Sequence, residues 1–360
     1  MTSKNRHIAL FLLITSMLVF PLLIHDSSEW NFLRTKNEVG SETESMSKGE
    51  RESELPDPVS LLFVGDIMLD RAVALHAQKY STNSLLSKIS NTLKKSDAVI
   101  GNLEGTITNK ASIAQKDFSI LRFTFDPKFS TWLSENGFRV LSLANNHALD
   151  FGEDGYAQTT QNLVNAGIKY FGSPRNNLNL HTSLFLKQKE ICFVGYHDLY
   201  TRDANEVIDT IKNNTRACSY TVLFAHWGKE YETTPNERQV MLAHFFIDAG
   251  ADLVVGAHPH VVQSLEIYKN KAIFYSLGNF IFDQNISFET EHGMMVEVTL
   301  LPSETHFSLI PIFINKSEVE IASRADYGKI LKPLFGDTLS AQIISDITNE
   351  QKFVLPINYP

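Results

Sequence analysis

Two histidines one residue apart, His258 and His260, are the residues of this 360-residue sequence that most clearly suggest metal chemistry. They follow a short apolar run, residues 253–255, and a turn at Gly256. A buried strand that ends in a tight turn places side chains at the carboxyl edge of a sheet, where imidazoles can bind a metal ion. We therefore expect the stretch 250–284 to be the centre of the functional site.

The other candidate ligands also come directly after apolar runs. The turns that follow these runs contain Asp66, Glu104, Asn146 with His147, and His226. Carboxylate, amide oxygen and imidazole together suit a borderline divalent ion such as Mn²⁺, Zn²⁺ or Fe²⁺. A carboxylate that bridges two such ions holds them about 3.5–4 Å apart, a spacing used for in-line attack on phosphorus.

Each of these residues alone has an ordinary explanation, such as a turn, a helix cap or a solvated charge. Their repetition decides the interpretation, because ligand-type residues follow one strand-like run after another along the chain. Convergent polar groups of this kind favour a metal site in one cleft. Asp70, Arg71 and Asn279 lie in or beside the same turns and are further candidates for substrate or accessory roles.

An alternation of strands, polar turns and helices must position these residues. Apolar runs predict strands at 59–64, 98–100, 138–143 and 220–224, and helical spacing predicts helices at 85–95, 127–136, 155–166 and 237–248. Such alternation indicates an α/β sandwich whose functional groups gather at one sheet edge. Further on, 294–300 and 309–314 predict a β-hairpin that closes the sheet, and 330–348 predicts a terminal helix.

Composition excludes some classes of partner. The chain is 43% hydrophobic and 20% charged, which fits one large globular α/β domain or two smaller ones. Its net charge of -9 disfavours nucleic acid as a partner and would not attract the chain to an anionic membrane surface. Cys192 and Cys218 each lie in or beside an apolar run, so we interpret them as buried thiols, with one disulfide between neighbouring strands as the alternative.

The N-terminus offers another route to a membrane. Residues 8–24 are apolar apart from Thr15 and Ser16, and Lys4 and Arg6 precede them. This run is at the short end of the roughly 17–25 residues that span a bilayer as a helix, and the preceding charges favour a cytoplasmic N-terminus. A cleaved signal peptide is the alternative, but residues 25–30 form a poor context for cleavage, which favours an uncleaved anchor.

Six ordered motifs resemble a known family. They are GDIMLDR, GNLEGTIT, SLANNHALDFG, FAHWGKEY, GAHPHVVQ and YSLGNFIFD, and they extend over roughly residues 59–300. In this order they resemble the CapA family of capsule synthesis proteins, which includes the poly-γ-glutamate synthesis and export component and belongs to the calcineurin-like metallophosphoesterase superfamily. The resemblance implies a four-layer α/β/β/α sandwich of the metallophosphoesterase kind, with an N-terminal membrane helix.

Composition and the resemblance together predict a domain organisation. Residues 1–25 would form the signal-anchor or transmembrane segment and 26–58, rich in Ser, Glu, Lys and Asn, a disordered tether. Residues 59–315 would form the CapA-like metallophosphoesterase domain, and 316–360 a C-terminal extension. The expected location is the bacterial cell membrane, with a single pass and the folded domain on the extracytoplasmic side.

Roles for individual residues follow from the same resemblance, which implies two divalent metal ions. Asp66 and His260 would bind one ion, Glu104 would bridge, and Asn146, His226 and His258 would bind the other. His147 would be the general acid for the leaving-group oxygen. Two positions depart from the superfamily: Met68 stands where a histidine is usual, so Asp70 or a water would have to substitute, and Glu104 stands where an aspartate is usual.

Three hypotheses about function remain open. The first is a membrane-anchored CapA-like protein in synthesis, export or attachment of an anionic polymer, with the membrane and the capsule or envelope polymer machinery as partners. The second is an envelope metal-dependent phosphatase or phosphodiesterase without a capsule role, acting on a phosphoester. The third is a non-catalytic partner in a polymer-export assembly. For binding an anionic polymer, Arg122, Lys229 and Arg238 are candidates for a basic face.

Overall fold

A computed structural model of the chain describes residues 57–214, 217–336 and 338–357. The expected signal-anchor at 1–25 and nearly all of the expected tether at 26–58 lie outside this part. Among the helices of the described residues, none has the length and apolar character needed to cross a membrane.

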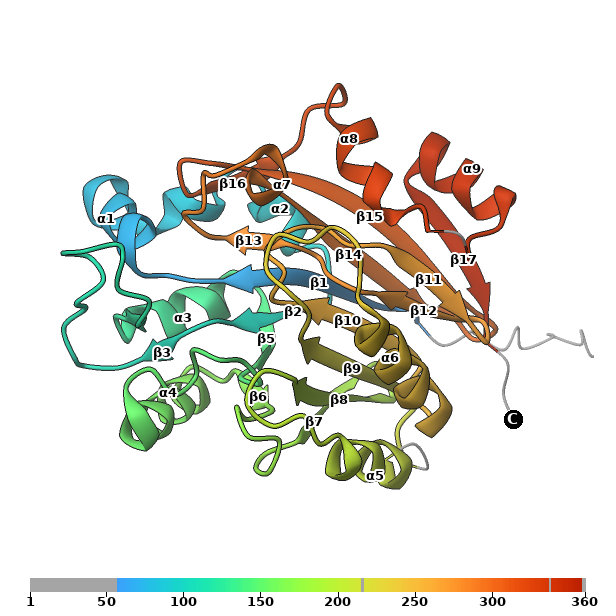
Figure 1. The fold of residues 1–360 in the computed structure, drawn as a ribbon, viewed down its shortest axis with the longest axis horizontal. Helices are drawn as coiled ribbons and strands as arrows, with labels where there is room; N and C mark the ends of the chain where they lie inside the picture. The colour runs from blue at the N-terminus through green and yellow to red at the C-terminus, as the bar shows by residue number, and fades with distance from the viewer. Residues whose placement is uncertain (1–56, 215–216, 337, 358–360) are drawn as a thin grey trace, which may run out of the picture. The chain divides into compact units, whose positions relative to one another are not determined.

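Two sheets form the centre of the fold (Figure 1). The larger sheet has nine strands in the order β16-β15-β14-β1-β2-β5-β6, with β13 beside β1 and β17 beside β15. Their bounds are β1 Val59–Ile67, β2 Ala98–Leu103, β5 Phe138–Ser142, β6 Lys169–Phe171, β13 Asn279–Ile281, β14 His292–Leu300, β15 Glu304–Asn315, β16 Glu318–Ile321 and β17 Lys352–Pro356. Strands β1, β2, β5 and β6 run parallel, whereas β14, β15 and β16 form an antiparallel edge.

The smaller sheet has six strands in the order β11-β12-β10-β9-β8-β7. Their bounds are β7 His181–Leu186, β8 Lys189–His197, β9 Tyr220–His226, β10 Leu253–Ala257, β11 Leu265–Tyr268 and β12 Lys271–Phe274. The central strands β8, β9, β10 and β12 are parallel, so the carboxyl ends of β9 and β10 lie at the same edge. A separate short pair, β3 Thr106–Ile107 and β4 Thr124–Phe125, lies outside both sheets.

Helices cover the outer faces of the sheets. Their bounds are α1 Arg71–Tyr80, η1 Thr82–Leu86, α2 Ser90–Leu93, α3 Lys128–Glu135, α4 Gly152–Asn165, α5 Asn205–Asn214, α6 Glu237–Ala249, α7 Phe288–Glu291, α8 Tyr327–Leu331, η2 Lys332–Leu334 and α9 Ala341–Glu350. Buried side chains of α1 to α4 share one core with the larger sheet, and those of α5 and α6 share another with the smaller sheet. Figure 1 shows α8 and α9 beside β15 and β17.

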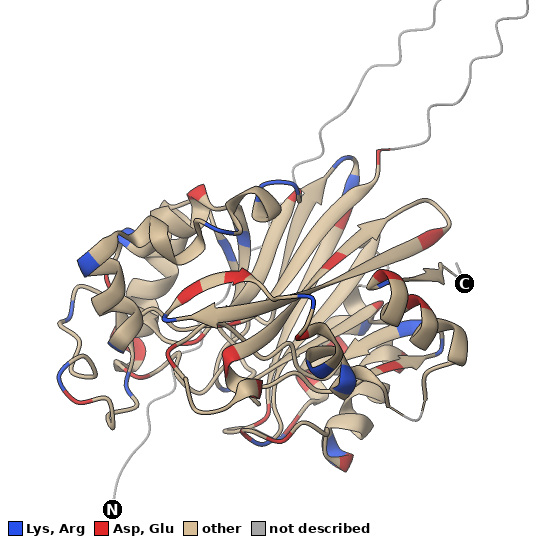
Figure 2. Ribbon diagram, turned by 90° about the horizontal axis from the view of Figure 1, so that it is seen from above, with Lys and Arg blue, Asp and Glu red and all other residues tan. Residues whose placement is uncertain are grey.

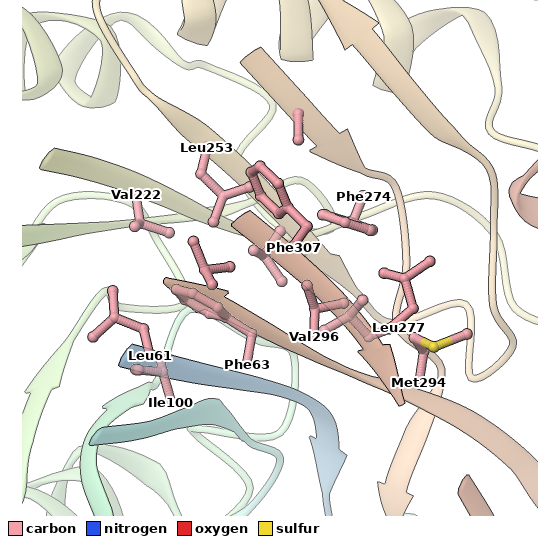
Figure 3. Packing of buried hydrophobic residues seen from close by; sticks show 14 of the residues in the cluster. Leu61, Phe63, Ile100, Val222, Leu253, Phe274, Leu277, Met294, Val296 and Phe307 are labelled. Carbon is pink, nitrogen blue, oxygen red and sulfur yellow. The ribbon is translucent and has the colours of Figure 1, made fainter. Parts of the chain in front are cut away.

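A third core lies between the two sheets. Strand β1 contributes to two cores, because successive side chains point to opposite faces of a strand. Leu61 and Phe63 belong to the core between the sheets, and Leu62 and Val64 to the core under the helices. In Figure 3, Leu61, Phe63 and Ile100 of the larger sheet are drawn in one cluster with Val222, Leu253 and Phe274 of the smaller sheet. The expected mixed α/β architecture is confirmed, and so is the hairpin of β14 and β15.

Two expectations were wrong. The single terminal helix over 330–348 is instead two helices, α8 and α9, with the short η2 turn between them. Pro333 lies in that turn, and a proline ring cannot donate the backbone hydrogen bond that a continuous helix needs. Cys192 and Cys218 are not thiols but form a disulfide between β8 and the residue two positions before β9, which was the alternative interpretation.

Candidate metal centre

The candidate ligands converge where parallel strands of both sheets end. From the larger sheet, Asp66 lies near the end of β1 and Glu104 follows β2 directly. From the smaller sheet, His226 is the last residue of β9 and His258 follows β10 directly. The backbone N–H of His258 donates to Asp66 Oδ2 at 3.1 Å, so the two sheets touch at the site itself.

One ligand group consists of Asp66, Glu104 and His226. Each offers a ligand atom, and these atoms all lie within 4.8 Å of one another. All three residues are at most 1% exposed. Burial raises the pKa of the Glu104 carboxyl well above its usual range, and the charge of Asp66 raises it further. Two buried carboxylates this close repel each other, and a divalent cation between them would relieve that repulsion.

A second ligand group consists of Glu230, His258 and His260, again with ligand atoms within 4.8 Å. His258 is only 5% exposed, and its Nδ1 atom is buried without a hydrogen-bond partner. Burial lowers the pKa of His258 to about 3, so the ring is neutral near pH 7 and its lone pair is available. A group of one carboxylate and two imidazoles, one of which has a buried and unpartnered nitrogen, fits a divalent transition metal.

The backbone of the His-x-His turn is unusual. His258 has a φ of 95° and His260 a φ of 60°, both in the left-handed region that side chains with a Cβ rarely adopt. Residues held in such conformations tend to occur at functional sites, where the surrounding structure enforces them. Here the turn brings both imidazoles into the same ligand group.

Asn279, the first residue of β13, sets the orientation of His260. The Nδ2 atom of Asn279 donates to the backbone oxygen of Thr290 at 3.1 Å, which fixes which way the amide points. Its Oδ1 lies 3.0 Å from His260 Nδ1, so that nitrogen must be the donor. The other ring nitrogen, Nε2, then keeps its lone pair and lies 3.8 Å from Glu104 Oε1. Asn279 is therefore a positioning residue for the His260 ring, in the way that buried partners orient metal-binding histidines.

An amide that sequence reasoning missed lies within the first ligand group. Asn102 Nδ2 lies 2.8 Å from Asp66 Oδ1, 3.2 Å from His226 Nδ1 and 3.5 Å from Glu104 Oε2. Its Oδ1 accepts from Asn145 Nδ2 at 3.0 Å. Asn102 lies in the GNLEGTIT motif, of which only Glu104 was considered as a ligand. In the structure Asn102 is in β2 and pairs in register with Asp66 of β1.

Asn146 and His226, both expected as ligands, are in contact. Asn146 Oδ1 lies 2.7 Å from His226 Nε2. Burial lowers the pKa of His226 well below its usual range, and the nearby His258 lowers it further, so this ring is also neutral near pH 7. Asn146 follows β5, whereas His226 ends β9, so this contact is another bridge between the larger and the smaller sheet.

His147 is held between Asp150 and Glu104. Its Nδ1 lies 2.8 Å from Asp150 Oδ2, and its Nε2 lies 3.8 Å from Glu104 Oε1. Phe123 packs on the ring, with centroids 4.4 Å apart, and its backbone N–H donates to the same Asp150 oxygen at 2.7 Å. Asp150 thereby holds the ring with Nε2 toward the first ligand group. Its place three residues after His147 was the signal that sequence reasoning overlooked.

His197 is a further buried histidine that was not expected. It ends β8 and pairs in register with His226, and their ring centroids are 5.7 Å apart. Its Nδ1 donates to the backbone oxygen of Pro174 at 2.7 Å, and its Nε2 is buried without a hydrogen-bond partner. Burial lowers the pKa of His197 to about 4.

Asp70 lies outside both ligand groups. Its carboxylate accepts hydrogen bonds from Arg71 N, Ser112 Oγ, Gln115 Nε2 and Thr124 N, at 2.8 to 3.0 Å. Met68 is fully buried, and its sulfur accepts from the backbone N–H of Asp70 at 3.1 Å. With four protein donors on its carboxylate, Asp70 holds the start of α1 and the segment near β4 together.

Arg71 is held at the edge of the site. Its guanidinium forms an ion pair with Asp283 and lies 5.0 Å from the ring centroid of Phe123 and 5.7 Å from that of Phe282. These aromatic residues also contact the site, since Phe123 packs on His147 and Phe282 lies 4.9 Å from the His260 ring. Arg71 is therefore a fixed positive charge close to the two groups.

The residues considered for a basic face have local partners. Lys229 pairs with Glu232 at 2.8 Å, and Arg238 pairs with Asp198 at 2.7 Å. Arg122 donates to the backbone oxygen of Asp150 at 2.7 Å. Figure 2 shows Lys and Arg interspersed with Asp and Glu on several elements of the described chain.

The two packed sheets and the converging carboxylates and histidines define a mixed α/β protein with a candidate divalent-metal centre. Within that class, the chain belongs to the bacterial capsule synthesis protein PGA_cap family, whose model matches residues 60–284. The resemblance to CapA proteins is thereby confirmed.

Several relatives share much of the chain. Capsule biosynthesis protein CapA of Bacillus anthracis is 30% identical over 330 residues, which cover 84% of this chain and 79% of that protein. PGA biosynthesis protein CapA of Bacillus subtilis (strain 168) is 32% identical over 279 residues, which cover 72% of this chain and 73% of that protein.

Solved structures resemble the chain more distantly. A putative 5'-nucleotidase from Staphylococcus aureus is 13% identical at a TM-score of 0.43, covering 79% of this chain and 56% of that one. A novel phosphatase from Mycoplasma pneumoniae is 14% identical at a TM-score of 0.40, and the match covers 74% of this chain and 92% of that one. At such low TM-scores these likenesses carry no argument.

Proposed function

We propose that this chain acts in the synthesis, export or attachment of an anionic capsule polymer, and that its buried site is a two-metal centre of the phosphoesterase type. The family and the names of its Bacillus relatives support the capsule role. The observation that carries the hydrolytic role is the placement of His147, whose Nε2 faces Glu104 while Asp150 holds the opposite ring nitrogen.

The proposed roles follow from the contacts of each side chain. The residues that would hold the ions are Asp66, Glu104, Asn146, His226, His258 and His260. Bound divalent ions would polarise a phosphoryl oxygen and lower the pKa of a water. Asp150 fixes the ring of His147, which donates a proton from Nε2 to the leaving oxygen. Asn279 keeps the His260 ring in the tautomer whose Nε2 can bind an ion.

The proposed location is the bacterial cell membrane. Residues 1–25 would cross it once, and the folded domain would lie on the extracytoplasmic side, where it meets the membrane-bound polymer machinery. The apolar run at 8–24 supports this proposal.

The hydrolytic role is tested by separating turnover from metal binding. Purified full-length protein is assayed for bound metal and for hydrolysis of p-nitrophenyl phosphoesters, alongside His147→Ala and His258→Ala. We expect His147→Ala to keep its metal but lose about 10²–10⁴ in turnover, and His258→Ala to lose both. His306→Ala is the matched control, because His306 lies on β15 and belongs to neither ligand group. This variant should behave as wild type.

The outcomes separate the three hypotheses. Unchanged turnover in His147→Ala would refute the general-acid role. Bound metal without turnover on any ester would favour the non-catalytic partner. An envelope phosphoesterase would be favoured if the purified protein hydrolyses phosphoesters but deletion of its gene leaves the capsule polymer of a producing strain unchanged.

Polymer binding is tested separately. Immobilised full-length protein should retain poly-γ-glutamate at low salt and release it when a chelator is added, because the metals would supply the positive charge that this acidic chain otherwise lacks. A protein that retains no polymer at low salt would contradict direct binding.

A further inference from the structure

We propose that Glu230 is a metal ligand that completes the group formed by His258 and His260. This inference rests on the proposed metal centre and adds Glu230, a residue of the FAHWGKEY motif that was not among the candidate ligands. The resemblance would place His258 and His260 on different ions, but their ligand atoms lie together with an oxygen of Glu230, and two imidazoles alone fall short of the three protein ligands that catalytic sites for such ions typically provide. A carboxylate is the chemistry that a borderline divalent ion accepts beside imidazole.

The first support is the position of its carboxylate. A Glu230 oxygen and ligand atoms of His258 and His260 lie within 4.8 Å of one another. The second support is independent of Glu230: His258 is buried, and its Nδ1 has no hydrogen-bond partner. A buried histidine with an unpartnered nitrogen, in one ligand group with an anionic oxygen, is explained if both residues bind the same cation.

The backbone places Glu230 at the histidines. The N–H of Tyr231 donates to the oxygen of Pro259 at 2.8 Å, so the residue after Glu230 is bonded to the residue between the two histidines. On the other side, the buried Trp227 donates from its backbone N–H to Ala257 O at 3.2 Å and from its indole to Tyr275 O at 2.9 Å. Both ends of this short segment are thus fixed to the strand and turn that carry the second ligand group.

Further bonds hold the end of the segment. Gln263 Nε2 donates to the backbone oxygen of Glu232 at 2.7 Å, and Gln284 Nε2 donates to the Tyr231 hydroxyl at 3.2 Å. These bonds fix the backbone on both sides of Glu230, so its place beside the histidines is determined by the fold.

Glu232 shows what an ordinary surface carboxylate looks like on the same segment. Its side chain is 55% exposed and pairs with Lys229, whose side chain is 75% exposed. Glu230 is also exposed, but its carboxylate belongs to a group with two buried histidines. Because one of its three ligands faces solvent, the ion of this group should be the more easily removed of the two.

The test compares variants at two glutamates of one segment. Glu230→Gln and Glu230→Ala are compared with Glu232→Gln in full-length protein, by metal content and by competition with a chromophoric chelator during titration with Mn²⁺ and Zn²⁺. We expect both Glu230 variants to bind one ion at least about tenfold more weakly. Removing a residue that hydrogen-bonds a metal ligand typically lowers metal affinity by about 10–100-fold, and removing a ligand itself should cost no less. Glu232→Gln should match wild type.

Thermal unfolding of the metal-free proteins shows whether a variant is folded, and the exposed position predicts midpoints equal to wild type. Metal binding by Glu230→Ala as tight as in wild type would overturn the assignment and leave the proposed function standing. A wild-type protein that binds no metal would overturn both. Weakened binding in Glu232→Gln to the same degree would also overturn the assignment, because the effect would then be one of general charge.

Discussion

Asn279 offers a direct test of how the site is organised, because its two amide atoms have separate partners. Its Oδ1 faces His260 Nδ1, while its Nδ2 donates to Thr290 O and Gln284 Oε1. Asn279→Ala removes both functions. Asn279→Asp keeps an acceptor for His260 but loses the donor, so the two variants should separate metal affinity from stability.

The expected magnitudes follow from these contacts. Removing the buried partner of a metal-binding histidine typically costs about 10–100-fold in metal affinity, which corresponds to about 1.4–2.7 kcal/mol. Asn279→Ala should show this loss. It should also lower the free energy of unfolding of the metal-free protein by about 1–3 kcal/mol for each buried group left unpaired, of which Thr290 O is one. Asn279→Asp should share the loss of stability but keep metal affinity near that of wild type, since a carboxylate accepts from His260 at least as well as an amide oxygen.

Two measurements decide the matter. Metal affinity is obtained by chelator competition, and stability by chemical denaturation of the metal-free proteins. Gln284→Ala is the matched control, because it removes a partner of Asn279 without touching His260. Equal metal affinities in wild type and Asn279→Ala, or equally weak binding by the Ala and Asp variants, would refute the positioning role.

Two further predictions concern the fold around the site. Replacing both Cys192 and Cys218 with serine should lower the free energy of unfolding by about 3–4 kcal/mol, the chain-entropy value for a sequence separation of 26 residues; a change below about 1 kcal/mol by denaturant titration would contradict it. For pH, burial lowers the pKa of His258 to about 3 and of His197 to about 4 from a usual 6.5, so the unfolded chain gains these protons first as pH falls. The metal-free protein should therefore lose stability from about pH 6.5 down to those values, with a smaller loss in His197→Gln, and unfolding midpoints that rise on acidification would contradict the argument.

The order of strands and helices could be predicted because apolar runs mark buried parallel strands. The same runs located the ligand-type residues, since each lies where a strand ends, and the structure brings Asp66, Glu104 and His226 into one group. His258 and His260 were recognised as a pair from their spacing. These predictions needed only local pattern and the rule that parallel strands end at the same edge.

The rest depended on contacts between distant segments. Glu230 lies in the FAHWGKEY motif but does not directly follow a strand, and its place beside His258 and His260 appears only in the folded chain. Asp150 and Asn102 become significant through partners on other elements. The disulfide was underrated because the adjacency of β8 and β9 cannot be known from two isolated cysteines. Each miss is a case in which tertiary packing decides the role of an ordinary residue.

The first ligand group draws on both sheets, since Asp66 and Glu104 come from the larger sheet and His226 from the smaller one, and this affects how the protein acquires an ion there. Neither sheet alone carries that group, so the free energy of binding this ion is available only after the sheets have packed together. A newly made chain therefore lacks this site, and its ion is chosen where folding is completed. In that setting, the supply of metals in the compartment outweighs the intrinsic order of affinities. The same polypeptide, folded in two different surroundings, would leave them with different metals.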